Sequence, residues 1–117
     1  MTNVQLFLKN ENIIRRIKVD QIYYIKIVNQ CVNVYLPKEK VFQTNFSLSE
    51  IEQLLPAYFL KIHRNCIVNI KKVIEFDIKN KKLLLINGKL LVVAVRKVKT
   101  VKDCLDPFLQ SETGLLL

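Results

Sequence analysis

Basic side chains are the residues in this sequence whose number points most directly to a binding chemistry. The 117 residues include 19 lysines and arginines against 10 aspartates and glutamates, a formal net charge of +9. Such an excess of positive charge in a short chain favours a polyanionic partner such as DNA or RNA. We expect no membrane partner, because the basic residues are interleaved with strand-like segments and do not follow a long amphipathic helix.

Catalytic chemistry has little support in the sequence. Two glycines, Gly88 and Gly114, are too few for a glycine-rich phosphate loop, and His63 is the only histidine that could serve a nucleophile as its base. A nuclease would need clustered carboxylates for a metal ion. Three aspartates in the C-terminal half show no such motif: Asp77, Asp103 and Asp106. We therefore expect no enzyme, no cofactor and no metal site.

The cysteines and the chain start indicate the cellular setting. Three cysteines lie far apart without a C-x-x-C pair: Cys31, Cys66 and Cys104. They predict neither a disulfide framework nor a zinc site, and they fit a reducing cytoplasm. The N-terminus lacks the apolar core of a signal peptide, and no run approaches the roughly 20 apolar residues that span a bilayer. We expect a soluble, cytoplasmic protein.

The elements that must position the basic residues are mainly β-strands. Short runs rich in Ile, Val, Tyr and Phe alternate with Asn, Lys and Gly turn signals, which predicts small, mostly antiparallel sheets. The expected strands are 13–18, 22–28, 31–36, 41–45, 58–62, 66–70, 73–78, 83–86 and 89–95. Asn29-Gln30 predicts one tight turn. Asn87-Gly88 predicts another hairpin, with the two positive φ angles of a type I′ turn.

Two helical segments are expected. Ser47 and Glu50 fit a capping box that starts a short helix near 47–55, before Pro56. A second short helix near the C-terminus would end near Pro107, with its apolar face made by Val98, Val101, Leu105 and Phe108. The length suits one compact domain, expected over residues 1–109, with a flexible tail at 110–117.

The segment from Phe59 to Asn69, FLKIHRNCIVN, resembles the most characteristic stretch of the LytTR family of bacterial DNA-binding domains, approximately F-x-R-x-H-R-S-x-x-V-N. Other parts of the family pattern have counterparts here: the helix at Ser47–Glu52, the turn Asn87-Gly88, the segment Ala94–Lys99 and the early strand Asp20–Lys26. The resemblance covers roughly Val4 to Leu105.

The resemblance implies an elongated, mainly β fold whose loops enter successive major grooves on one face of duplex DNA. Base-reading positions would be Asn29, Gln30, Arg64 and Arg96. Phosphate contacts would come from Lys61, His63, Asn65, Lys97 and Lys99. Such domains usually form the output half of response regulators in two-component systems, so the implied role is transcriptional regulation.

Each of these roles has a plainer alternative. The guanidinium forks of Arg64 and Arg96 match guanine O6 and N7, but most arginines are solvated surface residues. Asn29 and Gln30 could pair with adenine, although such residues at a hairpin tip often serve only the turn. His63 could contact a phosphate or hold its loop through a hydrogen bond to backbone. A generic RNA-binding or protein-interaction module remains the alternative function.

The sequence departs from the family pattern at three places. Asn65 and Ala94 stand where serine is usual, which affects individual phosphate hydrogen bonds, and Ile25-Lys26-Ile27 replaces a Glu-Ser pair. One domain of this size would read few bases, so we expect two copies on repeated half-sites, forming a homodimer on the DNA. The chain would be a stand-alone regulator or a fragment of one with an upstream receiver or sensor.

Overall fold

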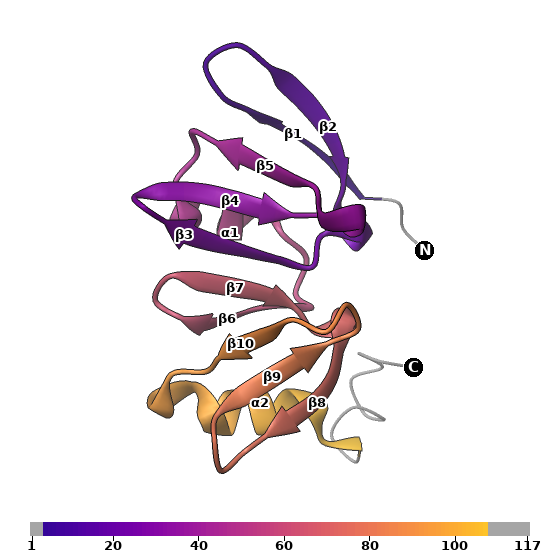
Figure 1. The fold of residues 1–117 in the computed structure, drawn as a ribbon, viewed down its shortest axis with the longest axis vertical. Helices are drawn as coiled ribbons and strands as arrows, with labels where there is room; N and C mark the ends of the chain where they lie inside the picture. Colours follow the sequence, from indigo (N-terminus) through magenta and orange to yellow (C-terminus); the bar gives the residue numbers. More distant parts are fainter. Residues whose placement is uncertain (1–3, 108–117) are drawn as a thin grey trace.

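Residues 4–107 are described by the structure, a computed structural model, and they form antiparallel sheets backed by two helices (Figure 1). The strands are β1 (Gln5–Lys9), β2 (Ile14–Lys18), β3 (Tyr24–Val28), β4 (Cys31–Tyr35), β5 (Val41–Thr44), β6 (Phe59–His63), β7 (Cys66–Asn69), β8 (Val73–Asp77), β9 (Lys82–Leu85) and β10 (Leu90–Val92). The helices are α1 (Leu48–Leu54) and α2 (Val98–Leu105), with 3-10 turns η1 (Val19–Gln21), η2 (Pro37–Glu39), η3 (Ile70–Lys72) and η4 (Val95–Lys97).

The strands form three sheets that follow one another along the long axis of the molecule (Figure 1). Within the described residues these are a β1-β2 hairpin, a central sheet ordered β5-β4-β3-β7-β6, and a third sheet ordered β10-β9-β8. The principal dimensions are 45 × 33 × 25 Å. The prediction of an elongated, mainly β fold built from small antiparallel sheets is confirmed.

Two hydrophobic cores hold these sheets together. The first lies between one face of the central sheet, the β1-β2 hairpin and α1, and includes Ile25, Ile67 and Ile51. The second joins the β6-β7 end of the central sheet to the third sheet and α2, through residues such as Leu85 and Val101. A fully buried side chain of this kind contributes roughly 1.5–3 kcal/mol, more than an exposed ion pair, so the cores fix how the sheets sit.

Helix α1 begins with the predicted capping box. The Ser47 hydroxyl accepts a hydrogen bond from the Glu50 amide at 3.1 Å, and the Glu50 carboxylate accepts one from the Ser47 amide at 2.8 Å. Leu48 and Ile51 are buried against the central sheet. Helix α2 likewise buries Val101. Phe108, expected on its apolar face, and the expected tail at 110–117 lie outside the described residues.

The turn at Asn87-Gly88 is not the predicted type I′ turn. Only Gly88 has a positive φ, of +88°. The Gly88 amide donates to the Leu85 carbonyl at 2.8 Å, and the Leu85 amide donates to Lys89 at 2.9 Å. This is a type I turn followed by a left-handed glycine, which adds one bulged residue to the hairpin. The Asn87 side chain accepts from the Lys89 amide at 3.0 Å and so stabilises that geometry.

The predicted strand 89–95 is also too long. Strand β10 ends at Val92, and Val95 already belongs to η4. The Ala94 amide leaves the third sheet and donates to Ile62 on β6 at 2.8 Å, which redirects the chain towards the central sheet. No helix of the described part is long and apolar enough to cross a membrane.

Candidate nucleic-acid interface

Three turns lie along one edge of the molecule, at the left in Figure 1. They are the β3-β4 turn at residues 29–30, the β6-β7 turn at residues 64–65, and η4 between β10 and α2. Backbone hydrogen bonds link them: the Ile27 amide donates to Asn65 at 3.0 Å, and the Ala94 amide donates to Ile62 at 2.8 Å. We refer to these three turns as the turn edge. The structure thus brings together residues that are more than 60 positions apart in sequence.

The side chains expected to read bases occur on all three turns. Arg64 and Arg96 are exposed, and neither forms an ion pair within residues 4–107. Asn29 and Gln30 are also exposed, with φ of 51° and 66°, so both central residues of this turn have positive φ. That two-residue geometry matches the twist of the flanking strands and makes the turn protrude as a tight tip. Long polar side chains therefore project from turns whose backbones are fixed.

His63 fixes the backbone around Arg64. Its Nδ1 accepts a hydrogen bond from the Asn65 amide at 3.2 Å, so the ring closes the turn that carries Arg64. Because Nδ1 is the acceptor, the proton of the neutral ring lies on Nε2, which can donate to another group. The structure therefore shows the backbone-holding role that was one of the two expectations for His63.

The lysines expected to contact phosphates differ in whether they already form an ion pair with a carboxylate. Lys61 Nζ lies 4.0 Å from Glu52 on α1, and Lys99 Nζ lies 3.0 Å from Asp103. Exposed pairs of this kind are worth about 0–1 kcal/mol, so a phosphate could displace the carboxylate at little cost. Lys97 is half-buried at the start of α2. Lys97 directly follows Arg96 in the chain, and neither side chain forms an ion pair with another described residue.

Lys26 is a basic residue of this edge that the sequence reasoning did not single out as a contact. It is exposed on β3, and it lines a hollow of about 230 Å³ together with His63, Asn65, Cys66, Leu91 and Val92. Burial raises the pKa of the Cys66 thiol to about 12, against the opposing effect of Lys26, so this wall of the hollow stays uncharged. The available signal was the strand alternation, which places Lys26 on the face opposite Ile25.

Nothing in the described part suggests a metal centre: residues 4–107 contain no group of three or more His, Cys, Asp or Glu side chains that could hold a metal ion. The chemistry of the turn edge is therefore that of exposed cations and amides on a rigid backbone. Such groups bind phosphates and base edges.

Comparison with models of known protein families identifies the family of this chain. The family model of the LytTr DNA-binding domain matches residues 12–106. The chain belongs to this family. LytTr domains are DNA-binding domains and not an enzyme family, so this LytTr domain is a DNA-binding protein module.

Solved structures agree on the fold. This LytTr domain is similar to the LytTr DNA-binding domain of a Bacillus cereus protein described as a methyl-accepting/DNA response regulator, with a TM-score of 0.72 and 22% sequence identity. The match covers 84% of this chain and 93% of that one. A search among curated proteins found no match. The resemblance drawn from FLKIHRNCIVN and its companion segments is confirmed.

Proposed function

We propose that this LytTr domain reads specific duplex DNA sequences through its turn edge and thereby regulates bacterial transcription. The observation that carries the proposal is the alignment of three protruding turns, with Arg64 and Arg96 exposed, on one edge whose spacing is fixed by backbone hydrogen bonds. Arginine can pair with guanine O6 and N7 in the major groove, worth about 1–3 kcal/mol of discrimination per contact.

The arrangement of the turns suits a continuous DNA face. The three turns follow one another along the long axis of the domain, so they can approach one side of a duplex together (Figure 1). Arg64 and Arg96 would read bases, with Asn29 and Gln30 at the third turn. The flanking cations would hold the phosphates: Lys26, Lys61, Lys97 and Lys99, with His63 and Asn65 beside them.

We expect two copies of the domain to bind together on DNA, because one copy has few base-reading side chains. A single domain offers few base contacts, so two copies on repeated half-sites, forming a dimer on the DNA, would supply the affinity and specificity of a regulator. In such a system the domain is the output part of a response regulator, controlled by a receiver or sensor domain. The resemblance to a response regulator's LytTr domain supports this role.

Competition between nucleic acids tests the proposal. Fluorescence anisotropy would compare a duplex, its single strands and an RNA duplex of the same sequence. We expect the DNA duplex to bind most tightly and its affinity to fall steeply with salt, because phosphate neutralisation releases counterions. Lys26→Ala should lower the slope of log affinity against log salt by about one, and Lys38→Ala, from the opposite edge, should not. Equal affinity for single strands or RNA would instead favour the generic module.

A further inference from the structure

A second hollow lies at the opposite edge of the domain, between the central and third sheets. Its volume of about 450 Å³ falls within the roughly 300–1,000 Å³ of small-molecule sites. It forms where β3 begins, where β4 ends and at the β9-β10 turn, which are the strand ends remote from the turn edge (Figure 1). We name it the tyrosine-lysine cleft after six of its lining residues: Tyr23, Tyr24, Tyr35, Lys38, Lys40 and Lys89.

Aromatic rings form one part of this cleft. Tyr24 and Tyr35 stack with centroids 4.2 Å apart and planes 11° apart. Tyr24 is buried, whereas Tyr35 and Tyr23 are half-buried and keep part of their surface open to the cleft. Burial raises the pKa of Tyr24 to about 12, so this ring is an uncharged part of the cleft floor. Tyr24 covers one face of Tyr35, and Lys72 Nζ lies 5.1 Å from the centroid of the Tyr23 ring, so Tyr35 and Tyr23 offer apolar surface with a further cation beside it.

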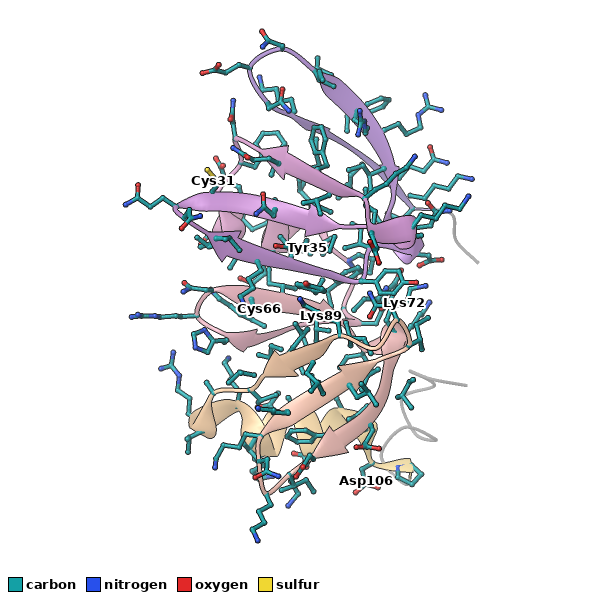
Figure 2. All side chains as sticks on the ribbon, viewed as in Figure 1. Cys31, Tyr35, Cys66, Lys72, Lys89 and Asp106 are labelled. Carbon is teal, nitrogen blue, oxygen red and sulfur yellow. The ribbon has the colours of Figure 1, made fainter. Side chains whose placement is uncertain are left out.

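Lysine side chains from turns of both sheets also line the tyrosine-lysine cleft. Lys38 and Lys40 come from the β4-β5 connection, and Lys89 comes from the β9-β10 turn. All three are exposed, and within residues 4–107 none forms an ion pair. Glu39 is the single carboxylate among the lining residues. Figure 2 shows Tyr35 on the central sheet and Lys89 below it at the border of the third sheet, with Lys72 further to the right.

The backbone that carries Lys38 is strained. Lys38 and Glu39 have φ of 62° and 61°, in the left-handed region, although neither is Gly or Asn. The turn is closed by the Leu36 amide donating to Lys40 at 2.8 Å. A left-handed residue with a Cβ costs roughly 1–2 kcal/mol, and strained residues of this kind cluster at ligand-binding sites. Here the hydrogen-bonded turn holds Lys38 and Lys40 at the rim of the cleft.

We propose that the tyrosine-lysine cleft binds a small aromatic anion of about mononucleotide size. Its planar ring lies on Tyr35 and Tyr23, and its phosphate or carboxylate group lies between Lys38 and Lys89. Because these lysines belong to different sheets, the ligand bridges the central sheet and the third sheet. The site is separate from the turn edge and does not depend on the reading of DNA.

Titration of the full chain with adenosine monophosphate tests this site. Amide resonances of the isotope-labelled protein would be followed by NMR, with adenosine and inorganic phosphate as separate arms. We expect saturable shifts at Lys38 and Lys89 with the nucleotide, and weaker binding of either part alone. Lys38→Ala and Lys89→Ala should each weaken nucleotide binding about tenfold, the loss of one charge-assisted contact, while Lys79→Ala on the β8-β9 turn should not.

Several results would overturn the proposal. They are the absence of saturable shifts, shifts confined to the Arg64 and Arg96 turns, equal affinity for phosphate and nucleotide, or unchanged binding in both cleft variants. The variants replace exposed side chains, so dispersed spectra serve as the check that they fold. A DNA duplex added to the nucleotide complex should bind as it does without nucleotide, and this arm reports on the turn edge independently of the cleft.

Discussion

His63 holds the turn that carries Arg64, the side chain we propose as a base reader, through a hydrogen bond to the backbone. Its Nδ1 accepts from the Asn65 amide across the Arg64 turn. We expect His63→Ala to lower the free energy of unfolding by about 1 kcal/mol, the net worth of a typical hydrogen bond, and to weaken specific DNA binding more than non-specific binding. Urea unfolding and anisotropy with specific and random duplexes measure the two effects. Undiminished specificity in this variant would show that the bond does not position Arg64.

Asn69 is a second single residue with a structural role, and it contributes to the stability of the fold. It is fully buried, its Nδ2 donates to the Ile22 carbonyl at 2.9 Å, and its Oδ1 accepts from the Lys71 amide at 2.9 Å. Asn69→Leu keeps the size of the side chain but leaves a carbonyl and an amide without this partner. We expect a loss of about 3 kcal/mol in denaturant unfolding, since each unsatisfied buried group costs roughly 1–3 kcal/mol. A loss below about 1 kcal/mol would mean that water replaces the side chain.

At the residue scale, sequence reasoning named the proposed base-reading residues but not the contacts of the residues around them. Arg64 and Arg96 came from the family resemblance, and both lie exposed on the turn edge. The pair between Lys99 and Asp103 is an i,i+4 pair that spacing alone could have indicated. The contact of Lys61 with Glu52 joins a strand to a helix, so it depends on packing that no local pattern encodes.

Helix α1 could be predicted from sequence because its start signal is local. The Ser47 and Glu50 pair makes both reciprocal bonds of a capping box. Ser47→Ala should cost about 1 kcal/mol in the free energy of unfolding, because the Glu50 amide loses the side chain that caps it. Ser49→Ala, at an exposed position in the same helix, is the matched control and should cause no loss. Equal losses in the two variants would contradict the capping argument.

The β9-β10 hairpin marks where local signals stop being sufficient. Asn87-Gly88 correctly indicated a hairpin but not its turn type, because the type depends on how many residues the hairpin leaves unpaired. A Cβ added at Gly88 would meet nothing within 4 Å, so Gly88→Ala tests the backbone conformation alone. We expect a loss of about 1 kcal/mol from the left-handed φ and a smaller loss for Gly88→Asn, measured by thermal unfolding. No difference between glycine and alanine would argue against the positive φ.

The end of β10 shows that strand lengths, like turn types, cannot be predicted from local signals alone. Residues 93–95 continue an apolar run that reads as strand, yet the Ala94 amide bonds to β6 and the chain turns into η4. The periodicity of apolar residues indicates which face of a segment is buried. It does not indicate which strand the segment will form hydrogen bonds with. The η4 turn that carries Arg96 exists because of this long-range bond, so its place beside the Arg64 turn could not follow from local patterns.

At the scale of the whole molecule, the elongated arrangement of small sheets was predicted from the family resemblance and not from composition, whereas the number of sheets and the order of their strands were not predicted. The two hydrophobic cores explain why this arrangement is rigid. The first joins the hairpin and α1 to the central sheet, and the second joins the central and third sheets. Many buried residues lie in the predicted strands, but local patterns could not assign these strands to one core or the other.

The central claim is that the turn edge reads sequence, and selection of bound sites from a random duplex library tests it most directly. Wild type, Arg64→Ala and Arg96→Ala would be compared at one fixed salt concentration, because electrostatic affinity changes with salt. The account predicts an enriched motif in which each variant relaxes preference at a different base, by about 1–3 kcal/mol. Tight binding without enrichment, or variants that retain the full motif, would contradict it.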